Sequence, residues 1–366
     1  MLIVFFISIL CLLLTAAEVR GKYKHGMLLG FLLVTFLYCI HYDYGTDYMT
    51  YYVEFNAVVH SKLSFMDVFD LDNWRNGEYG WGLLQWVFAH LGSNGFFAMV
   101  ALISVVENLI IYKVIRKYLD RKYWPFAVFV YLFSSTFYLL GFSMMRQWLA
   151  MCLFVFAIDL MMERKILWSV VVVYLASTIH HTATILLPFV FVPFIPLRFS
   201  RYYGLAMICL FAILMLVGDA LNSTLGILMA QSDTIEDYIT NYDSYDANKG
   251  FGIGFLINTI PFVLSIIYLI KADDSKYKLL ILLSCIGTMI VPFSQSLAMV
   301  KRMSLYFTLF SVLTIPIVYN IISNKTLRYI LIAVFVLMQI VGYYGFLNDP
   351  SYIDHYRDFK TIFPQL

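Results

Sequence analysis

Charged residues are scarce in this sequence. Asp, Glu, Lys and Arg make up 13% of its 366 residues, whereas soluble globular domains carry about 25%. The deficit extends along nearly the whole chain, because 61% of the residues are hydrophobic and the mean hydropathy is +0.79. A soluble globular domain is therefore excluded. The net charge of +2 includes no basic cluster larger than a membrane anchor, so nucleic acid is not an expected partner.

Paired cysteines are also missing. The five cysteines lie singly within apolar runs, their number is odd, and none forms a CxxC motif: Cys11, Cys39, Cys152, Cys209 and Cys285. This arrangement gives neither a disulfide framework nor a zinc site. We expect no metal and no other cofactor.

Long apolar runs make up most of the sequence. Most are roughly 16–22 residues long, enough for a helix to cross about 30 Å of hydrocarbon. A chain in lipid must satisfy its backbone hydrogen bonds internally, so these runs must be helices. We predict an all-α polytopic transmembrane bundle of about 12 spans, forming a single membrane domain over residues 1–366. The predicted spans are 1–19, 26–42, 94–115, 125–142, 146–162, 166–180, 182–197, 203–219, 253–270, 279–297, 303–322 and 327–346.

Two further helices are expected outside these spans. Residues 48–59 have apolar and aromatic side chains at helical spacing, which predicts an amphipathic helix at the outer membrane surface. Residues 78–91 predict a short apolar helix that is half-buried or re-entrant. The first apolar run has no positive charges before it, so we interpret it as a retained span and not as a cleaved signal peptide.

The distribution of positive charge predicts the orientation. With both termini outside, 17 of the 25 lysines and arginines lie on the inner side and 8 on the outer side, as the positive-inside rule requires. The long extramembrane segments, 43–78, 219–252 and 347–366, then all lie outside, so any chemistry is expected on the outer face. Glu107 and Asp159 lie toward the inner ends of their spans, where we expect them to pair with basic residues or face the bundle interior.

Two arginines on the outer side depart from the charge bias. Arg146 lies in a tight turn between two apolar runs, and Arg302 begins a later span. Each could extend to lipid headgroups. Alternatively each could face a cavity and bind phosphate, because a guanidinium binds phosphate through a bidentate fork. Two converging arginines would suit a diphosphate.

Four titratable residues near the outer ends of spans have both a structural and a functional interpretation. Asp47 could be a helix-cap or loop carboxylate, and Glu78 could stabilise a helix N-terminus. His180 and His181 could be hydrogen-bonding residues between packed helices. As functional groups, these side chains could transfer protons or orient a cation.

Local motifs along residues 43–310 resemble those of the EpsG family, which is related in role to Wzy-type polymerases of bacterial surface polysaccharides. The motif residues are Gly45, Asp47 and Tyr51; Glu78, Gly80 and Trp81; Arg146, Gln147 and Ala150; His180, Thr182 and Ala183; and Arg302 with Tyr306. Their order along the chain and their placement in the predicted topology carry the resemblance.

The resemblance implies a glycosyltransferase that polymerises polyprenyl-diphosphate-linked oligosaccharide repeat units without a metal ion. It would act at the outer face of the bacterial inner membrane and make O-antigen, capsule or exopolysaccharide. Its partners would be the lipid-linked donor and acceptor, membrane lipids and a possible chain-length regulator protein. The implied catalytic residues are Arg146, His180, Asp47 and Glu78, and the implied substrate-binding residues are Arg302, Gln147, Tyr51 and Tyr306. Arg357 in the C-terminal tail is a further predicted substrate-binding residue.

Three other functions remain open at this point. A flippase or exporter would move lipid-linked sugars between leaflets without changing their length. A membrane glycosyltransferase that uses a polyprenyl-phosphate sugar would add a single sugar. A ligase would move finished polymer to a different acceptor. Product size separates the first two from a polymerase, and the identity of the acceptor separates the third.

Overall fold

The computed structural model describes residues 2–61, 63–74, 77–194, 201–229, 253–271, 277–290 and 298–365. The chain divides into two compact units. Unit 1 comprises Met1–Ile195 and Gln339–Leu366, and unit 2 comprises Pro196–Met338. The expectation of one membrane domain stays a prediction. Residues 230–252, which form most of the predicted second outer segment, lie outside the described residues.

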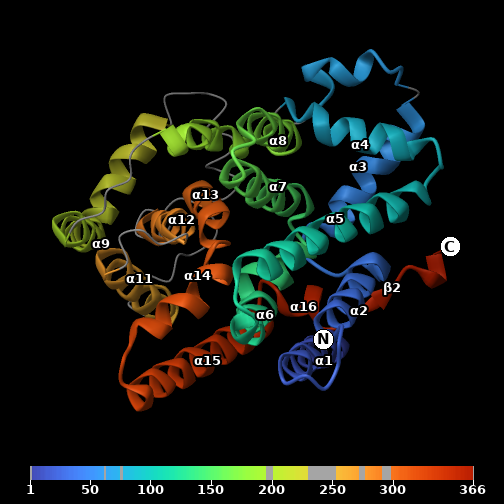
Figure 1. The fold of residues 1–366 in the computed structure, drawn as a ribbon. Coiled ribbons are helices and arrows are strands. Elements are labelled where there is room, and N and C mark those ends of the chain that lie inside the picture. The colour runs from blue at the N-terminus through green and yellow to red at the C-terminus, as the bar shows by residue number, and fades with distance from the viewer. Residues whose placement is uncertain are drawn as a thin grey trace. The chain divides into compact units, whose positions relative to one another are not determined.

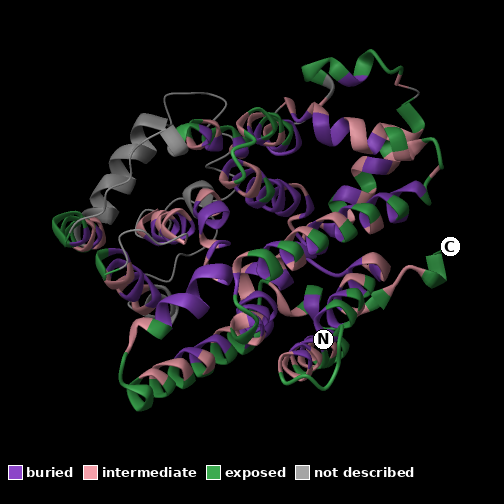
Figure 2. Ribbon diagram, viewed as in Figure 1, coloured by how far each residue is buried: buried purple, intermediate pink, exposed green. Residues whose placement is uncertain are grey.

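Unit 1 is built around α7. Its helices are α1 (Leu2–Val19), α2 (Gly26–Ile40), α3 (Tyr48–Ser61), α4 (Tyr79–Ala89), α5 (Gly95–Tyr118), α6 (Trp124–Phe133), α7 (Met145–Met162) and α8 (Ile166–Ile179) (Figure 1). The apolar stretch of α7 is 72% buried, whereas that of α1 is 28% buried, and Figure 2 shows α7 mostly in the buried colour. An apolar helix buried on all sides is the expected centre of a bundle.

Unit 2 contains the later apolar helices. These are α9 (Arg201–Met229), α11 (Ile253–Lys271), α12 (Lys278–Ile290), α13 (Ala298–Thr308) and α14 (Ser311–Val318). α9 continues beyond residue 219, where we predicted its span to end. α15 (Lys325–Asn348) begins in unit 2 and ends in unit 1.

The described residues do not support the predicted number of about 12 membrane spans. Within the described residues, four helices are long and apolar enough to cross a membrane: α1, α5, α7 and α15. α13 and α14 form a fifth candidate if their pair, bent by 51°, counts as one span. Six further apolar helices have only 10–17 residues. The chain is thus a multi-pass helical membrane protein, and its described residues contain four or five candidate spans in place of about 12.

Local interruptions explain part of this correction. The predicted span 125–142 breaks at Ser134, whose extended backbone (ψ 126°) separates α6 from a π-helical turn, Ser135–Leu139. The Ser134 hydroxyl accepts a hydrogen bond from the Thr136 N–H, and such local bonds compete with helix formation. The predicted span 182–197 instead forms a 3-10 helix, His181–Phe194. Pro188 within it lacks the N–H that an α-helix needs.

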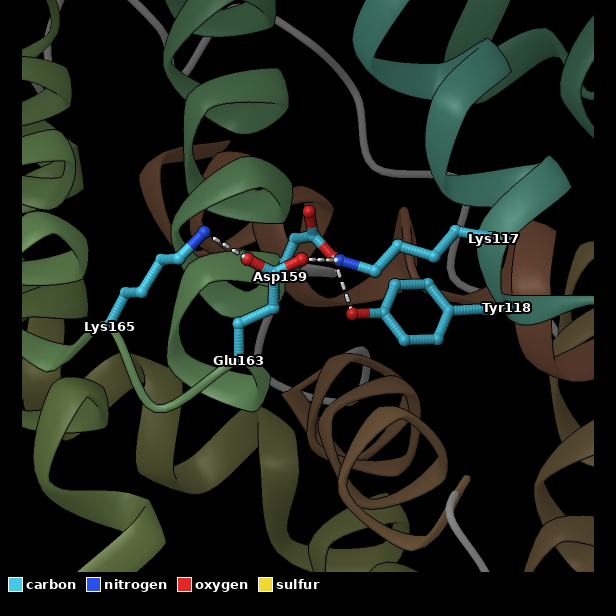
Figure 3. Close-up of polar contacts among 5 residues, drawn as sticks. All are labelled: Lys117, Tyr118, Asp159, Glu163 and Lys165. Carbon is cyan, nitrogen blue, oxygen red and sulfur yellow. Dashed lines mark hydrogen bonds and ion pairs between the residues drawn. The ribbon is translucent and has the colours of Figure 1, made fainter.

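The C-terminal ends of α1, α5 and α7 lie at one end of unit 1. The Lys117 ammonium at the end of α5 bonds to Asp159 and Glu163 at the end of α7, and Tyr118 also donates to Asp159 (Figure 3). Lys117 and Lys165 hold the pKa of Glu163 at about 2. The predicted pairing of Asp159 is therefore confirmed. Glu107 is 2% exposed and faces the bundle interior, as predicted.

The same end includes the end of α1. The Glu18 carboxylate lies 4.0 Å from Arg116, and the Glu18 carbonyl accepts from Arg121. We call this the basic end of unit 1, because Lys117 and Lys165 also lie there. The N-termini of α5 and α7 and the C-termini of α2 and α8 therefore lie at the opposite end.

A short sheet at this opposite end is the one departure of the described residues from an all-α fold. β1 (His41–Tyr42) pairs antiparallel with β2 (Lys360–Thr361), with His41 opposite Thr361. The C-terminal segment, which includes α16 (Ile353–Tyr356), thus packs beside the loop that follows α2. The predicted outer helix 48–59 corresponds to α3, and the predicted short helix 78–91 corresponds to α4.

Candidate active site

A buried carboxylate joins two basic side chains at the end of unit 1 opposite the basic end. Glu78 Oε2 accepts a hydrogen bond from Arg146 Nη1 at 2.7 Å, and Glu78 Oε1 lies 2.9 Å from His180 Nδ1. The backbone N–H of His181 donates to the same Oε1, also at 2.9 Å. The side chains of Glu78, Arg146 and His180 are 3%, 13% and 10% exposed. We call these three residues the Glu78 cluster.

Three segments that are distant in sequence position this cluster. Glu78 immediately precedes α4, Arg146 is the second residue of α7, and His180 directly follows α8. Close packing of α4 against α8 depends on Gly80, because a Cβ atom there would lie 2.2 Å from Thr178 Oγ1. The start of α4 therefore reaches the end of α8, and the Glu78 carboxylate reaches the imidazole.

The Glu78 carboxyl is ionised despite its burial. Burial raises its pKa, but the hydrogen bond from His180 and the positive charge of Arg146 outweigh that effect, so the pKa lies below the ordinary value. Three donors already occupy the two carboxylate oxygens. Glu78 is therefore a poor proton acceptor and well suited to hold Arg146 and His180 in place.

The contact with Glu78 also determines which nitrogen of His180 carries a proton. An ionised carboxylate only accepts hydrogen bonds, so Nδ1 of His180 is protonated. In a neutral imidazole the lone pair then lies on Nε2. An imidazole oriented in this way can take a proton from a hydroxyl, and the carboxylate stabilises the resulting imidazolium.

Arg146 lies where the helix dipole of α7 adds to its positive charge. The first turn of a helix has N–H groups without backbone partners, which favour an anion. The Arg146 Cζ atom lies 5.1 Å from the centre of the Tyr51 ring, within cation–π range. Burial raises the pKa of Tyr51 to about 12 although Arg146 opposes the shift, so Tyr51 is a neutral phenol. In the part of the chain that the structure describes, no group accepts a hydrogen bond from Arg146 Nε.

The loop that carries Asp47 is attached to the turn before α7. Gly45 has a φ of +113°, and a Cβ there would lie 2.8 Å from a carbonyl oxygen of that turn, so a larger residue does not fit. The Ser143 hydroxyl lies 2.5 Å from Thr46 Oγ1 and accepts from the Asp47 N–H at 3.1 Å. Asp47 precedes Tyr51 by one helical turn. Asp47 is thus held at the end of unit 1 that contains the Glu78 cluster.

The C-terminal segment packs against the same loop. The Gly45 N–H donates to the His355 carbonyl at 3.2 Å, and the Tyr356 hydroxyl donates to the Leu139 carbonyl at 3.0 Å. Arg357 follows Tyr356 and has an exposed side chain. The structure therefore places Arg357 at the same end of unit 1 as Asp47.

The remaining predicted site residues have different surroundings. Gln147 is buried next to Arg146 in α7. Arg302 and Tyr306 lie on α13 in unit 2, and Tyr306 is fully buried there. The Glu78 cluster is thus formed by unit 1 alone. Substrate binding by these three residues stays a prediction.

Sequence reasoning missed two contributors to the site, the His181 backbone N–H and the Ser143 hydroxyl. A backbone amide has no residue signature. Ser143 does have one, because a serine in a short turn between apolar runs often bonds to nearby backbone groups. Within the described ranges, no three His, Cys, Asp or Glu side chains are grouped so that they could hold a metal ion.

The model of the EpsG family matches residues 26–356 of the chain. No curated protein and no solved structure matches. The matched range contains the whole Glu78 cluster and the Asp47 loop.

Proposed function

Because the chain belongs to the EpsG family, whose membrane proteins are linked to exopolysaccharide biosynthesis, we propose that it polymerises polyprenyl-diphosphate-linked oligosaccharide repeat units. The Glu78 cluster is the observation that carries this proposal. It combines an oriented imidazole with a guanidinium at a helix N-terminus, next to apolar helices suited to a polyprenyl tail. By the positive-inside rule, the cluster faces the periplasm or the cell exterior of the bacterial inner membrane, and both termini lie outside.

The reaction transfers the growing chain from its carrier to a hydroxyl of the next lipid-linked repeat unit. The bond between the anomeric carbon and the diphosphate oxygen breaks, and its electron pair leaves with the diphosphate. A new bond forms between the anomeric carbon and the acceptor oxygen. The acceptor proton moves to His180 Nε2. This nitrogen carries the lone pair of the neutral imidazole, because Nδ1 carries the proton that is donated to Glu78. The diphosphate is the leaving group, so no nucleotide sugar and no other energy source is required.

Arg146 neutralises the charge that develops on the departing diphosphate. It does so from the first turn of α7, with donors that Glu78 does not use. Arg302 stays proposed as a substrate-binding residue. Asp47 binds acceptor hydroxyls or assists proton transfer, and Glu78 acts as a positioning residue for Arg146 and His180.

Four further side chains are proposed to contact substrate, namely Gln147, Tyr51, Tyr306 and Arg357. Tyr51 has the clearest support, because its ring already lies against the Arg146 guanidinium. Arg357 has an exposed side chain at the same end of unit 1. Chain length would be set by a separate regulator protein.

The test uses purified protein in lipid vesicles with lipid-linked repeat units isolated from cells that cannot polymerise them. We expect a ladder of products without a gradient or ATP. Arg146→Ala and His180→Gln should abolish the ladder while folded protein remains in the membrane. His181→Gln is the matched control, because the His181 imidazole is exposed and only its backbone contacts Glu78.

Other outcomes would contradict the proposal. Movement of the repeat unit between leaflets without a change in length would indicate a flippase. Addition of one sugar from a polyprenyl-phosphate donor would indicate a membrane glycosyltransferase of another kind. Normal chain lengths from Arg146→Ala would remove this residue from the mechanism.

A further inference from the structure

Two buried hydrogen-bond donors lie on α4 beside the Glu78 cluster. Trp81 and Gln85 are both 2% exposed. They follow Glu78 by three and seven residues, so all three positions lie on one face of the helix. Among the described residues, no group accepts a hydrogen bond from Trp81 Nε1 or Gln85 Nε2. We call Trp81 and Gln85 the α4 donor row.

The Tyr51 ring connects the α4 donor row to the guanidinium of Arg146. The Trp81 and Tyr51 rings lie 5.6 Å apart, edge to face, and the Tyr51 ring lies 5.1 Å from Arg146 Cζ. Arg146 Nε is a third buried N–H group without an acceptor among the described residues. From Trp81 to Gln85, the row extends about 6 Å along the helix axis at 1.5 Å per residue.

The chemistry of the unpartnered atoms restricts the ligand. All three are N–H donors, and buried donors are normally paired because an unpaired one costs folding free energy. The indole and the amide are neutral, whereas the guanidinium is charged. The complementary ligand has neutral acceptor oxygens on one side and an anionic group on the other. A sugar bonded to a diphosphate has this pattern, since its hydroxyl, ring or acyl oxygens adjoin the phosphate charge.

We propose that Trp81 and Gln85 form a sugar-binding subsite for the sugar that is bonded to the carrier diphosphate. The α4 donor row donates hydrogen bonds to the sugar oxygens, and Arg146 holds the diphosphate beside them. This inference rests on the proposed function, because it takes the diphosphate to bind at Arg146. The subsite distinguishes the repeat unit from the bare carrier, which has the diphosphate and no sugar.

Trp148 provides a matched control for Trp81. It is 1% exposed, and its Nε1 also has no acceptor among the described residues. It follows Arg146 by two residues, so it lies on the opposite side of α7, where its ring packs near Tyr131 and Phe137. Trp148→Phe therefore removes the same kind of donor from the bundle core and leaves the α4 donor row intact.

The experiment measures equilibrium binding of two probes to the purified full-length protein in detergent. One probe is the lipid-linked repeat unit, and the other is the same polyprenyl diphosphate without sugar. Loss of one hydrogen bond from a buried site weakens binding by about tenfold. We expect Trp81→Phe, Gln85→Leu and Gln85→Met each to weaken binding of the sugar-bearing probe about tenfold and to leave the bare carrier unchanged. Trp148→Phe should change neither.

Gel filtration and thermal unfolding show which variants are folded, and three substitutions in the row keep the inference testable. Equal losses for both probes, or no loss for either, would overturn it. Its failure is distinguishable from failure of the proposed function. A wild-type protein that discriminates the probes through the donor row but makes no ladder would refute the polymerase alone. A ladder together with unchanged binding in the row variants would refute the subsite alone.

Discussion

Replacing Glu78 with glutamine should disrupt the hydrogen bonds that join this side chain to Arg146 and His180, while keeping a side chain of nearly the same shape. The carboxylate accepts from Arg146 on one oxygen and from His180 and the His181 backbone on the other. A glutamine amide places an NH2 group at one of these positions, where it faces a donor. Arg146 also loses the negative charge that balances it in a buried setting.

The magnitude follows from these contacts. Removing one partner of a buried ion pair costs about 3–5 kcal/mol. Arg146 retains 13% exposure, and the amide oxygen can still accept one hydrogen bond, so we expect a loss of about 3 kcal/mol in the free energy of unfolding, the low end of that range. Glutamine also no longer determines the tautomer of His180. Because general-base catalysis contributes about 10²–10⁴-fold, polymer formation should fall by at least about 100-fold.

The assay compares ladder formation at equal amounts of folded protein, together with thermal unfolding in detergent. Glu18→Gln is the control, since Glu18 is another carboxylate that is 2% exposed and lies near an arginine, at the basic end of unit 1. It should lose stability and keep its specific activity. Near wild-type polymer from folded Glu78→Gln, or an equal loss of activity in Glu18→Gln, would refute the positioning role of Glu78.

Four further outcomes are expected. The pKa of Glu78 is lowered in the fold, so the ionised carboxylate stabilises the folded protein fully above the ordinary glutamate pKa of 4.5, and this contribution is lost as the pH falls from there through the lowered pKa. Melting temperatures measured against pH should show this loss in the wild type and not in Glu78→Gln. Gly80→Ala places a methyl group 2.2 Å from Thr178 Oγ1, which should separate α4 from α8 and lower both ladder yield and melting temperature; unchanged values of both would contradict the packing argument. Ser143→Ala, which removes the hydroxyl that joins the Asp47 loop to the turn before α7, should cost about 1 kcal/mol in unfolding measurements and reduce the yield partially. Lys117→Met, at the basic end of unit 1, should change stability by less than about 1 kcal/mol, because the Lys117 side chain is 37% exposed, and should leave the ladder unaltered.

Several helix positions could be predicted from the sequence because the apolar runs there have nearly the same boundaries as the helices. α1, α4 and α7 each begin and end within two residues of the predicted limits. Whether a helix is long and apolar enough to span a membrane was less predictable, since single side chains can interrupt a helix within an apolar run. The hydroxyl of Ser134 ends α6 early, although the residues on both sides are apolar.

The members of the candidate site could be named from the sequence, but their contacts could not. Arg146, His180 and Glu78 lie in separate motifs, and 68 and 102 residues separate Glu78 from its two partners. Only the packing of α4 on α8 through Gly80 brings the carboxylate to the imidazole. The unpartnered donors of the α4 donor row also depend on burial, which no sequence pattern near Gln85 indicates.

The pairing of β1 with β2 has a consequence for biosynthesis. The loop that carries Asp47 and the strand before it are made early, whereas the segment that bonds to them, at residues 355–361, is made much later. At a translation rate of about 5–20 residues per second, more than 300 residues separate the two by roughly 15–60 s. During that interval the helices made first enter the membrane without their final partner. The Asp47 loop acquires its contacts with the C-terminal segment only when the ribosome has released that segment, so a shorter nascent chain lacks them.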